Sequence, residues 1–297
     1  IQGREDILKV HSRGKPFEES VDFKKIAQTT VGFTGADLAN LLNEAALISA
    51  RKSKSLIGPG DIDDAMIKIT VGTQKKKANI KPEEKRKTAY HEAGHAILAH
   101  LLPTQDPVRQ ISIIPSGRAL GYTLNPPTED KYSVYKSELC ENIMMLLGGR
   151  AAEEIVYGDV SGGASNDIMR ATQTARKMVT ELGMSDVIGN VRLGSDRDDG
   201  EVFLGRDFNS TVNYSDTTAS LIDSEIKKII DEAYMKAKAL LIANRYKLDF
   251  VTDFLCKYEI MDDEEFRLAM EDGTTPEMLD ELVRQKREKS RAENEAR

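Results

Sequence analysis

The sequence has 297 residues, a formal net charge of -7 and two cysteines. This length allows two domains with cores of their own, and the acidic balance argues against nucleic acid as a partner. Cys140 and Cys256 stand far apart without ligand spacing, which indicates reduced thiols in a reducing compartment. Because no apolar stretch reaches membrane-spanning length and no signal peptide is present, we expect the chain itself to be soluble.

Apolar residues recur at helical spacing through residues 1–72, which predicts a small helical domain. Thr34-Gly35-Ala36-Asp37 opens its longest helix, and Asp61 is expected to cap a further one. The helical spacing begins with the first residues and the sequence does not start with Met, so we expect that the N-terminus has been cut. Residues 73–87 follow as a charged linker containing Pro82, in which acidic neighbours favour a solvated segment over a lysine run that binds membranes or nucleic acid.

The segment His91-Glu92-Ala93-Gly94-His95 carries the pattern H-E-x-x-H, and it holds two of the four histidines in the chain. Apolar residues at helical spacing surround it until Pro103, which predicts a helix. Positions i and i+4 of a helix share one face, so both imidazoles reach one metal ion. Zinc with three protein ligands lowers the pKa of a bound water to about 7. With Glu92 as the base, the pattern predicts hydrolysis of amide bonds.

The residues alone leave the third metal ligand open. His100 lies on the helix face opposite the first histidine of the pattern, so it is a poor ligand. Two segments compete instead: the acidic helix end 148–155 and the glycine-rich loop 161–168. In the second, Ser165 as the N-cap would place Asp167 in the first turn of a helix. An acidic first turn is also what compensation of the helix dipole gives, so neither segment is preferred.

Residues 88–282 are predicted to form a second, mostly helical domain. Segments 110–114 and 119–123 predict a short β-hairpin, whose second strand is a candidate docking edge for an extended substrate. The residues 283–297 alternate charges with almost no apolar content, so we expect a disordered tail. Helices are expected at 133–157, 165–182, 215–244, 246–258 and 262–270.

Four motifs, in this order, resemble the FtsH family of membrane-anchored, ATP-dependent zinc metalloproteases. They are TAYHEAGHA (88–96), IPSGRALG (114–121), GGRAAEE (148–154) and GASNDI (163–168). The resemblance extends over nearly the whole chain and weakens in about the last fifteen residues. It implies that Asp167 is the third zinc ligand beside His91 and His95, with Glu92 as the catalytic residue. Glu153 and Glu154 then become supporting or structural residues.

Residues 1–72 resemble the C-terminal helical lid of an AAA ATPase module. In such lids Ile7, His11 and the Gly35-Ala36 turn would border the adenine and ribose of a nucleotide, although helix packing explains these residues equally well. The sequence contains no G-x-x-x-x-G-K-[ST], so the ATP-hydrolysing half is expected outside this chain. The implied cofactors are Zn²⁺ here, and ATP with Mg²⁺ in the full-length parent.

We therefore expect a mainly α protein, with a helical lid followed by a mostly helical zinc peptidase domain that holds a short β-hairpin or small sheet. The expected function is a zinc endopeptidase of protein quality control that degrades unfolded or ATPase-fed proteins, membrane proteins included. The resemblance implies a homo-hexamer, held to a membrane by an N-terminal segment that the chain lacks, and no nucleic acid partner. The parent is expected in a bacterial inner membrane with this part facing the cytoplasm, or in an organelle membrane.

The alternative function is a catalytically inactive scaffold, in which the helices serve oligomerisation and act as the lid of an ATPase. The intact set of His91, Glu92 and His95 argues against it, because an inactive relative has no reason to keep the general base. A free-standing metallopeptidase for small peptides is disfavoured by the lid.

Overall fold

The computed structural model describes residues 1–74, 80–117, 119–130, 133–193 and 214–295. Within these residues the fold is mainly α with one small antiparallel sheet, which confirms the expected fold class. The chain divides into two compact units. The first consists of Ile1–Leu101, Asp106–Tyr132 and Arg245–Arg297, and the second of Leu102–Gln105 and Ser133–Asn244. No helix among the described residues is long and apolar enough to cross a membrane.

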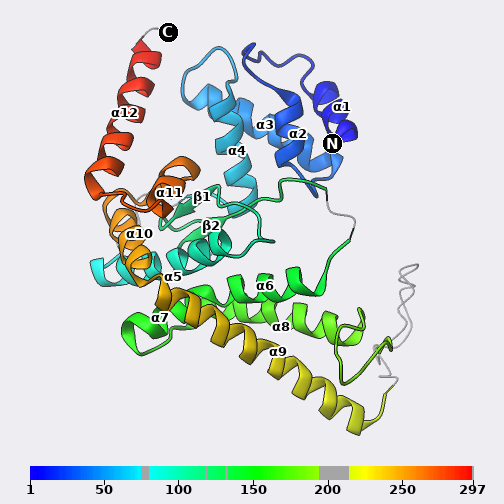
Figure 1. The fold of residues 1–297 in the computed structure, drawn as a ribbon. Coiled ribbons are helices and arrows are strands. Elements are labelled where there is room, and N and C mark those ends of the chain that lie inside the picture. The colour runs from blue at the N-terminus through cyan, green and yellow to red at the C-terminus, as the bar shows by residue number, and fades with distance from the viewer. Residues whose placement is uncertain (75–79, 118, 131–132, 194–213, 296–297) are drawn as a thin grey trace. The chain divides into compact units, whose positions relative to one another are not determined.

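The N-terminal part of the first unit is built from four helices that surround a common apolar core (Figure 1). They are α1 (Gln2–His11), α2 (Phe23–Thr29), α3 (Gly35–Arg51) and α4 (Pro59–Val71). The helix α3 opens as predicted, because the Thr34 side chain accepts from the amide of Asp37 and the Asp37 carboxylate accepts from that of Thr34. Its apolar stripe then packs against α1 and α4.

Asp61 is not the N-cap of α4, contrary to the prediction. Gly58 occupies that position, and the amide of Gly58 donates to the carboxylate of Asp61 over 3.1 Å. Pro59 takes the first helical position, where its missing N–H costs no hydrogen bond. The sequence therefore identified the right turn of the chain and placed the start of the helix a few residues too late.

The helix α5 (Pro82–Leu101) carries the H-E-x-x-H pattern and lies in the first unit. It begins at Pro82, inside the segment 73–87 that we predicted to be a linker, while residues 75–79 lie outside the described part of the chain. Its second half is almost completely buried and packs along α10 (Arg245–Tyr258). A hydrogen bond of 2.8 Å from the hydroxyl of Tyr90 to Asp249 joins the two helices.

A three-stranded antiparallel sheet lies beside α5, in the order β2-β1-β3. The strands are β1 (Gln110–Ser112), β2 (Tyr122–Leu124) and β3 (Ile260–Asp262). The predicted hairpin is confirmed, but β2 begins at Tyr122 rather than at residue 119, because Ser116 and Ala119 form an isolated bridge across the turn. The third strand was not predicted. It places β1 in the centre and leaves β2 at an edge of the described sheet.

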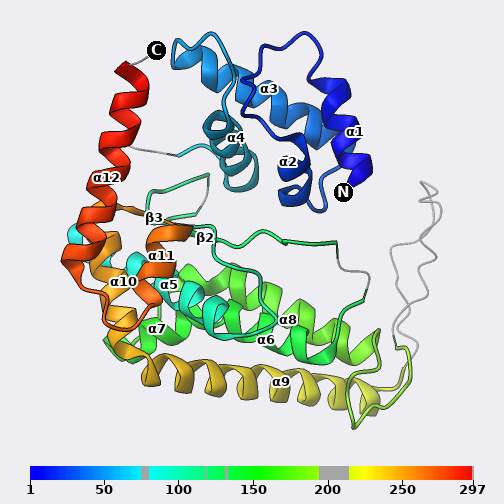
Figure 2. The ribbon, with the colours of Figure 1, turned by 45° about the horizontal axis from the view of Figure 1, so that its top comes forward.

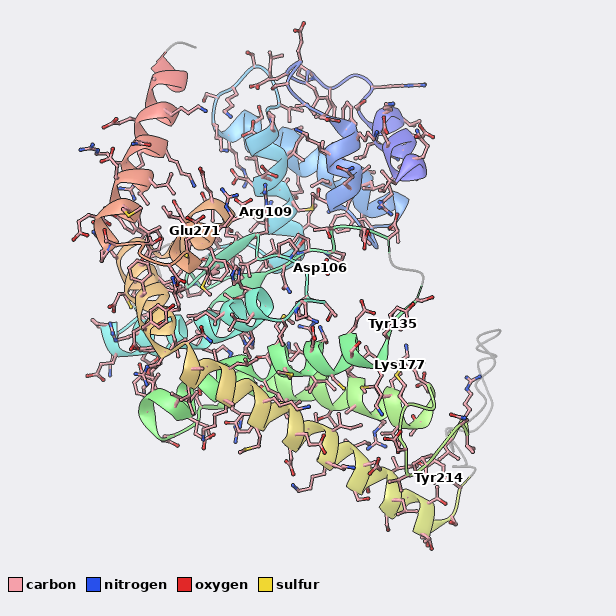
Figure 3. All side chains as sticks on the ribbon, in the orientation of Figure 1. Asp106, Arg109, Tyr135, Lys177, Tyr214 and Glu271 are labelled. Carbon is pink, nitrogen blue, oxygen red and sulfur yellow. The ribbon has the colours of Figure 1, made fainter. Side chains whose placement is uncertain are left out.

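The chain enters the sheet through a polar segment that Figure 3 marks with Asp106 and Arg109. The amide of Thr128 donates to Asp106 over 3.1 Å, and Arg109 lies 3.0 Å from the carboxylate of Asp263. Asp263 is the first residue of α11 (Asp263–Met270), so this ion pair ties the start of β1 to the helix that follows β3. The ends of the sheet are thereby fixed on both sides of the central strand.

The tail expected to be disordered is helical instead, since α12 runs from Pro276 to Glu295. Leu279 and Val283 bury an apolar edge of it. Arg284 pairs with Glu281 and lies 4.0 Å from Glu288, at i,i+3 and i,i+4 spacing, which stabilises a helix. The alternating charges, from which we predicted disorder, therefore form ion pairs along one face of a helix.

The second unit is a bundle of α6 (Lys136–Leu146), α7 (Gly148–Tyr157), α8 (Ser165–Thr180) and α9 (Asp216–Ala243). The long α9 runs beside the other three, as Figure 2 shows, and its Ser215 cap is as predicted. The helix predicted over 133–157 is two helices that divide at Leu147. Two successive glycines, Gly148 and Gly149, follow this point, and each lowers helix propensity by about 1 kcal/mol.

Candidate active site

The two histidines of the pattern lie one turn apart on α5, with their rings toward each other. Their Nε2 atoms are 3.1 Å apart and the ring planes are inclined by 77°. Two imidazole nitrogens bound to one zinc ion at about 2.0–2.1 Å in tetrahedral geometry would be separated by about 3.3 Å. His91 and His95 therefore stand at the spacing that a shared metal ion requires.

Glu92 is buried, with 7% of its surface exposed, although it sits between two residues of a polar site. A buried carboxylate needs hydrogen-bond donors, and β2 supplies one. The hydroxyl of Thr123 lies 2.9 Å from Glu92 Oε2 and 3.0 Å from the main-chain oxygen of the same residue. The sequence analysis did not identify Thr123, because its approach to α5 depends on the register of the sheet.

Asp167 lies in the first turn of α8, as predicted. Ser165, however, is the first helical residue rather than the N-cap, and the N-cap is Ala164 without a side-chain hydrogen bond. The reason is the 3-10 turn η1 (Gly162–Ala164), which leads directly into α8 and carries its own cap. That cap is Ser161, whose Oγ accepts from the amide of Gly163 over 3.1 Å. The position of Asp167 thus depends on the turn before it.

The competing segment 148–155 supplies support for this turn. Glu153 is 6% exposed, and its carboxylate accepts from the amide of Ser161 over 2.7 Å and from its hydroxyl over 3.0 Å. Glu154 accepts from the hydroxyl of Tyr234 and from Lys238 Nζ, and the two donors hold the pKa of Glu154 below its ordinary value. Both glutamates are therefore engaged by protein groups.

Ligand atoms of His91, His95 and Asp167 all lie within 4.8 Å of one another. Two imidazoles and one carboxylate, with one coordination position left for water, form the donor set of a catalytic zinc site. The group therefore fits zinc. His100 is not part of it, and its ring packs edge-on against Phe266 with 5.8 Å between ring centroids.

Comparison with known proteins identifies the family. The model of peptidase family M41 matches residues 78–268. The chain belongs to peptidase family M41. An AAA+ lid domain model matches residues 20–64. Within the family, the ATP-dependent zinc metalloprotease FtsH 2 of Alkaliphilus metalliredigens is 50% identical over 90% of this chain and 39% of its own length. FtsH of Bacillus subtilis is 49% identical over 93% of this chain and 43% of its own.

These matches confirm the resemblance to FtsH proteins and do not favour the alternative of an inactive scaffold. They also set a limit, because this M41 chain spans about two fifths of the length of these relatives. The roles of single residues are not decided by overall similarity.

The four residues predicted to border a nucleotide all lie on α1 and at the start of α3. Ile7 and Gly35 adjoin, since a Cβ on Gly35 would be 4.0 Å from Ile7 Cδ1. His11 ends α1 and is exposed, as is Ala36 in the first turn of α3. The structure thus brings two of the four together, and nucleotide binding stays a prediction.

Proposed function

We propose that this chain is the peptidase and lid portion of an ATP-dependent zinc metalloprotease, and that it cleaves peptide bonds in unfolded proteins. One observation carries the proposal. The ligand atoms of His91, His95 and Asp167 converge, and the buried carboxylate of Glu92 follows directly after the first ligand on α5. Membership of the M41 family and the names of the relatives support it.

In this proposal His91, His95 and Asp167 hold the metal. Bound zinc supplies Lewis acidity, which acidifies a water molecule and polarises the scissile carbonyl. Glu92 takes the proton of the attacking water and then delivers it to the amine that leaves. A base that does both must stay beside the reacting atoms, and burial between α5 and the sheet limits the movement of its side chain.

The edge strand β2 is the proposed docking place for substrate. It pairs with β1 on one side only, so the backbone groups of its other edge can accept an extended peptide by β-augmentation. Main-chain hydrogen bonds do not depend on side chains, hence sequence preference should be loose. Such recognition suits unfolded polypeptides, including membrane proteins extracted by an ATPase, because most of the backbone of a folded protein is already hydrogen-bonded.

The remaining parts of the proposal concern the parent protein. Residues 1–72 are its nucleotide-binding lid, with Ile7, His11, Gly35 and Ala36 beside the adenine and ribose of ATP, which the full-length parent binds together with Mg²⁺. Residues 88–282 are its peptidase domain. The match of an AAA+ lid model supports the first assignment. The parent is a homo-hexamer anchored in a bacterial or organelle membrane, with this part in the cytoplasm or its equivalent and without a nucleic acid partner.

Substitution of the site residues tests the roles separately. His91→Phe and Asp167→Ala should lose zinc in elemental analysis, whereas His100→Phe, a change of the same kind on the same helix, should keep it. Glu92→Gln should keep zinc and fold but lose proteolysis of an unfolded protein such as casein by a factor of about 10² or more. A zinc-loaded Glu92→Gln protein with wild-type turnover would show that another group activates the water. Full zinc occupancy in Asp167→Ala would remove Asp167 from the site.

A second experiment tests the substrate class and assembly. Since the chain contains no phosphate-binding loop, it should not hydrolyse ATP, and it should digest one protein in its unfolded form but not in its folded form. The digestion is compared with and without ATP, and the mass in solution is measured. ATP-stimulated digestion of the folded form would contradict the proposed division of labour, and a monomer with full activity would contradict the hexamer.

A further inference from the structure

Two residues of the edge strand β2 and its approach, Gly121 and Thr123, face Glu92. Successive residues of extended chain point to opposite sides, so positions 121 and 123 share one side. Tyr122 between them points away, and its hydroxyl donates to Gln110 Oε1 over 2.6 Å. The free backbone edge of this short segment is the proposed substrate site, and the face that carries positions 121 and 123 lies against the general base.

The hydroxyl of Thr123 has two acceptors, and both belong to Glu92. It lies 2.9 Å from Oε2 of the carboxylate and 3.0 Å from the main-chain oxygen. A hydroxyl between these two atoms ties the end of the glutamate side chain to its own backbone, which excludes most of its rotamers. The hydroxyl has one proton, which these two acceptors share.

Gly121 limits the same side chain from another direction. A Cβ at this position would lie 2.8 Å from Glu92 Oε1 and 2.8 Å from the main-chain oxygen of Ser112. The oxygen of Ser112 belongs to β1 and cannot yield easily. The bare Cα of Gly121 therefore leaves the space that one carboxylate oxygen occupies, while Thr123 binds the other oxygen.

The position of Thr123 is set by the sheet. Thr123 pairs with Ile111, which is completely buried in the central strand, and Ser112 pairs with Tyr122. A slip of the register by one residue would turn Thr123 away from α5. Its hydroxyl is thus presented by a paired strand.

We propose that Thr123 is a positioning residue for the reaction, whose hydroxyl holds the Glu92 carboxylate in the orientation for proton transfer. This inference rests on the proposed function of Glu92 as the base. Thr123 acts only through Glu92, and it binds neither metal nor substrate with its side chain. Removal of the hydroxyl should therefore lower kcat and leave KM and zinc binding unchanged.

The test compares Thr123→Val, which keeps the shape and removes the hydroxyl, with Thr123→Ser, which keeps the hydroxyl. Because small misplacements of a catalytic group cost up to about a hundredfold, we expect kcat on unfolded casein to fall by about tenfold to a hundredfold in the valine variant. The serine variant should stay within about threefold of wild type. Thr88→Val removes an exposed hydroxyl, bound to the Glu84 main-chain oxygen over 3.0 Å, and is the control for the substitution itself.

Two further readouts separate positioning from a structural role. Zinc content should be equal in all three variants, and a crystal structure of metal-free Thr123→Val should show the Glu92 carboxylate displaced within an unchanged sheet. In the Glu92→Gln background, Thr123→Val should cause no additional loss. Wild-type kcat in Thr123→Val, or an equal loss in the serine variant, overturns the role of Thr123 while Glu92→Gln stays inactive. An active Glu92→Gln protein overturns the proposed function itself.

Discussion

Glu153 offers a test of how the turn before Asp167 is held. Its buried carboxylate accepts two hydrogen bonds from Ser161, over 2.7 Å to the amide and 3.0 Å to the hydroxyl. Each bond to a charged group contributes about 1.5–3 kcal/mol, and Ser161 is itself exposed, so water can replace part of what is lost. Glu153→Ala should therefore lower the local stability of this turn by about 2–4 kcal/mol, allowing for partial replacement by water.

Glu153→Gln is the matched control. Its amide oxygen can still accept from the Ser161 amide and its NH₂ group can donate to the hydroxyl oxygen, so the loss should be about 1 kcal/mol. Hydrogen exchange of the Ser161 amide is the appropriate measurement, because it reports local opening in a chain of two compact units, where a single unfolding free energy is not defined.

The same variants should differ in zinc affinity. Asp167 follows Ser161 by six residues, through η1 and the first turn of α8. Groups that hold a ligand segment typically change metal affinity by about 10–100-fold when they are removed. We expect a loss in this range for Glu153→Ala and a smaller one for Glu153→Gln. Unchanged exchange of Ser161 together with unchanged zinc affinity would refute the reasoning.

Two other buried or paired groups give predictions. Lys247 is 5% exposed and donates to the main-chain oxygens of Ala269 and Glu271 at the end of α11. Lys247→Met should therefore destabilise the first unit by about 1.5–3 kcal/mol. Hydrogen exchange of α11 measures this loss, and unchanged exchange would contradict the prediction. The pKa of Glu154 lies below its ordinary value of 4.5, so its ion pair stabilises the fold above that pH and is lost as the pH falls through the folded-state pKa. Glu154→Gln should therefore be less stable than wild type at pH 7, and this difference should shrink below about pH 4.5 when the unfolding of the second unit is followed across pH. A difference independent of pH would contradict the assignment.

The sequence predicted the parts of the site that depend on local spacing. His91, Glu92 and His95 lie within five consecutive residues, and the helix that carries them follows from apolar periodicity alone. The third ligand was different, because two acidic segments satisfied the same local rules. Only the resemblance to a known family distinguished Asp167 from Glu153. In the structure Asp167 belongs to the metal-binding group, and Glu153 binds the turn before it through Ser161.

The errors in the fold also follow from what local patterns omit. The strand β3 has three residues, too few for a recognisable alternation, and it exists because β1 has a second edge to pair. Composition alone did not reveal the α12 helix, because its charges are i,i+3 and i,i+4 neighbours on a helix anchored by Leu279 and Val283. The strand β3 therefore depends on pairing between segments that are distant in sequence, and α12 depends on which helix face carries its charged and apolar residues.

Burial of carboxylates is the signal that could have found Thr123 and Ser161 earlier. Once Glu92 is predicted to lie in a helix of mostly apolar residues, its carboxylate is expected to be buried. A buried carboxylate requires hydrogen-bond donors from another segment. In both cases the structure shows a hydroxyl residue within two positions of a glycine, Gly121 before Thr123 and Gly163 after Ser161. At Gly121 the glycine gives the carboxylate the room that a side chain would occupy. A search of the two residues on either side of each family motif for a hydroxyl near a glycine would therefore have found both donors. Only the sheet register and the helix ends decide which carboxylate each of them meets.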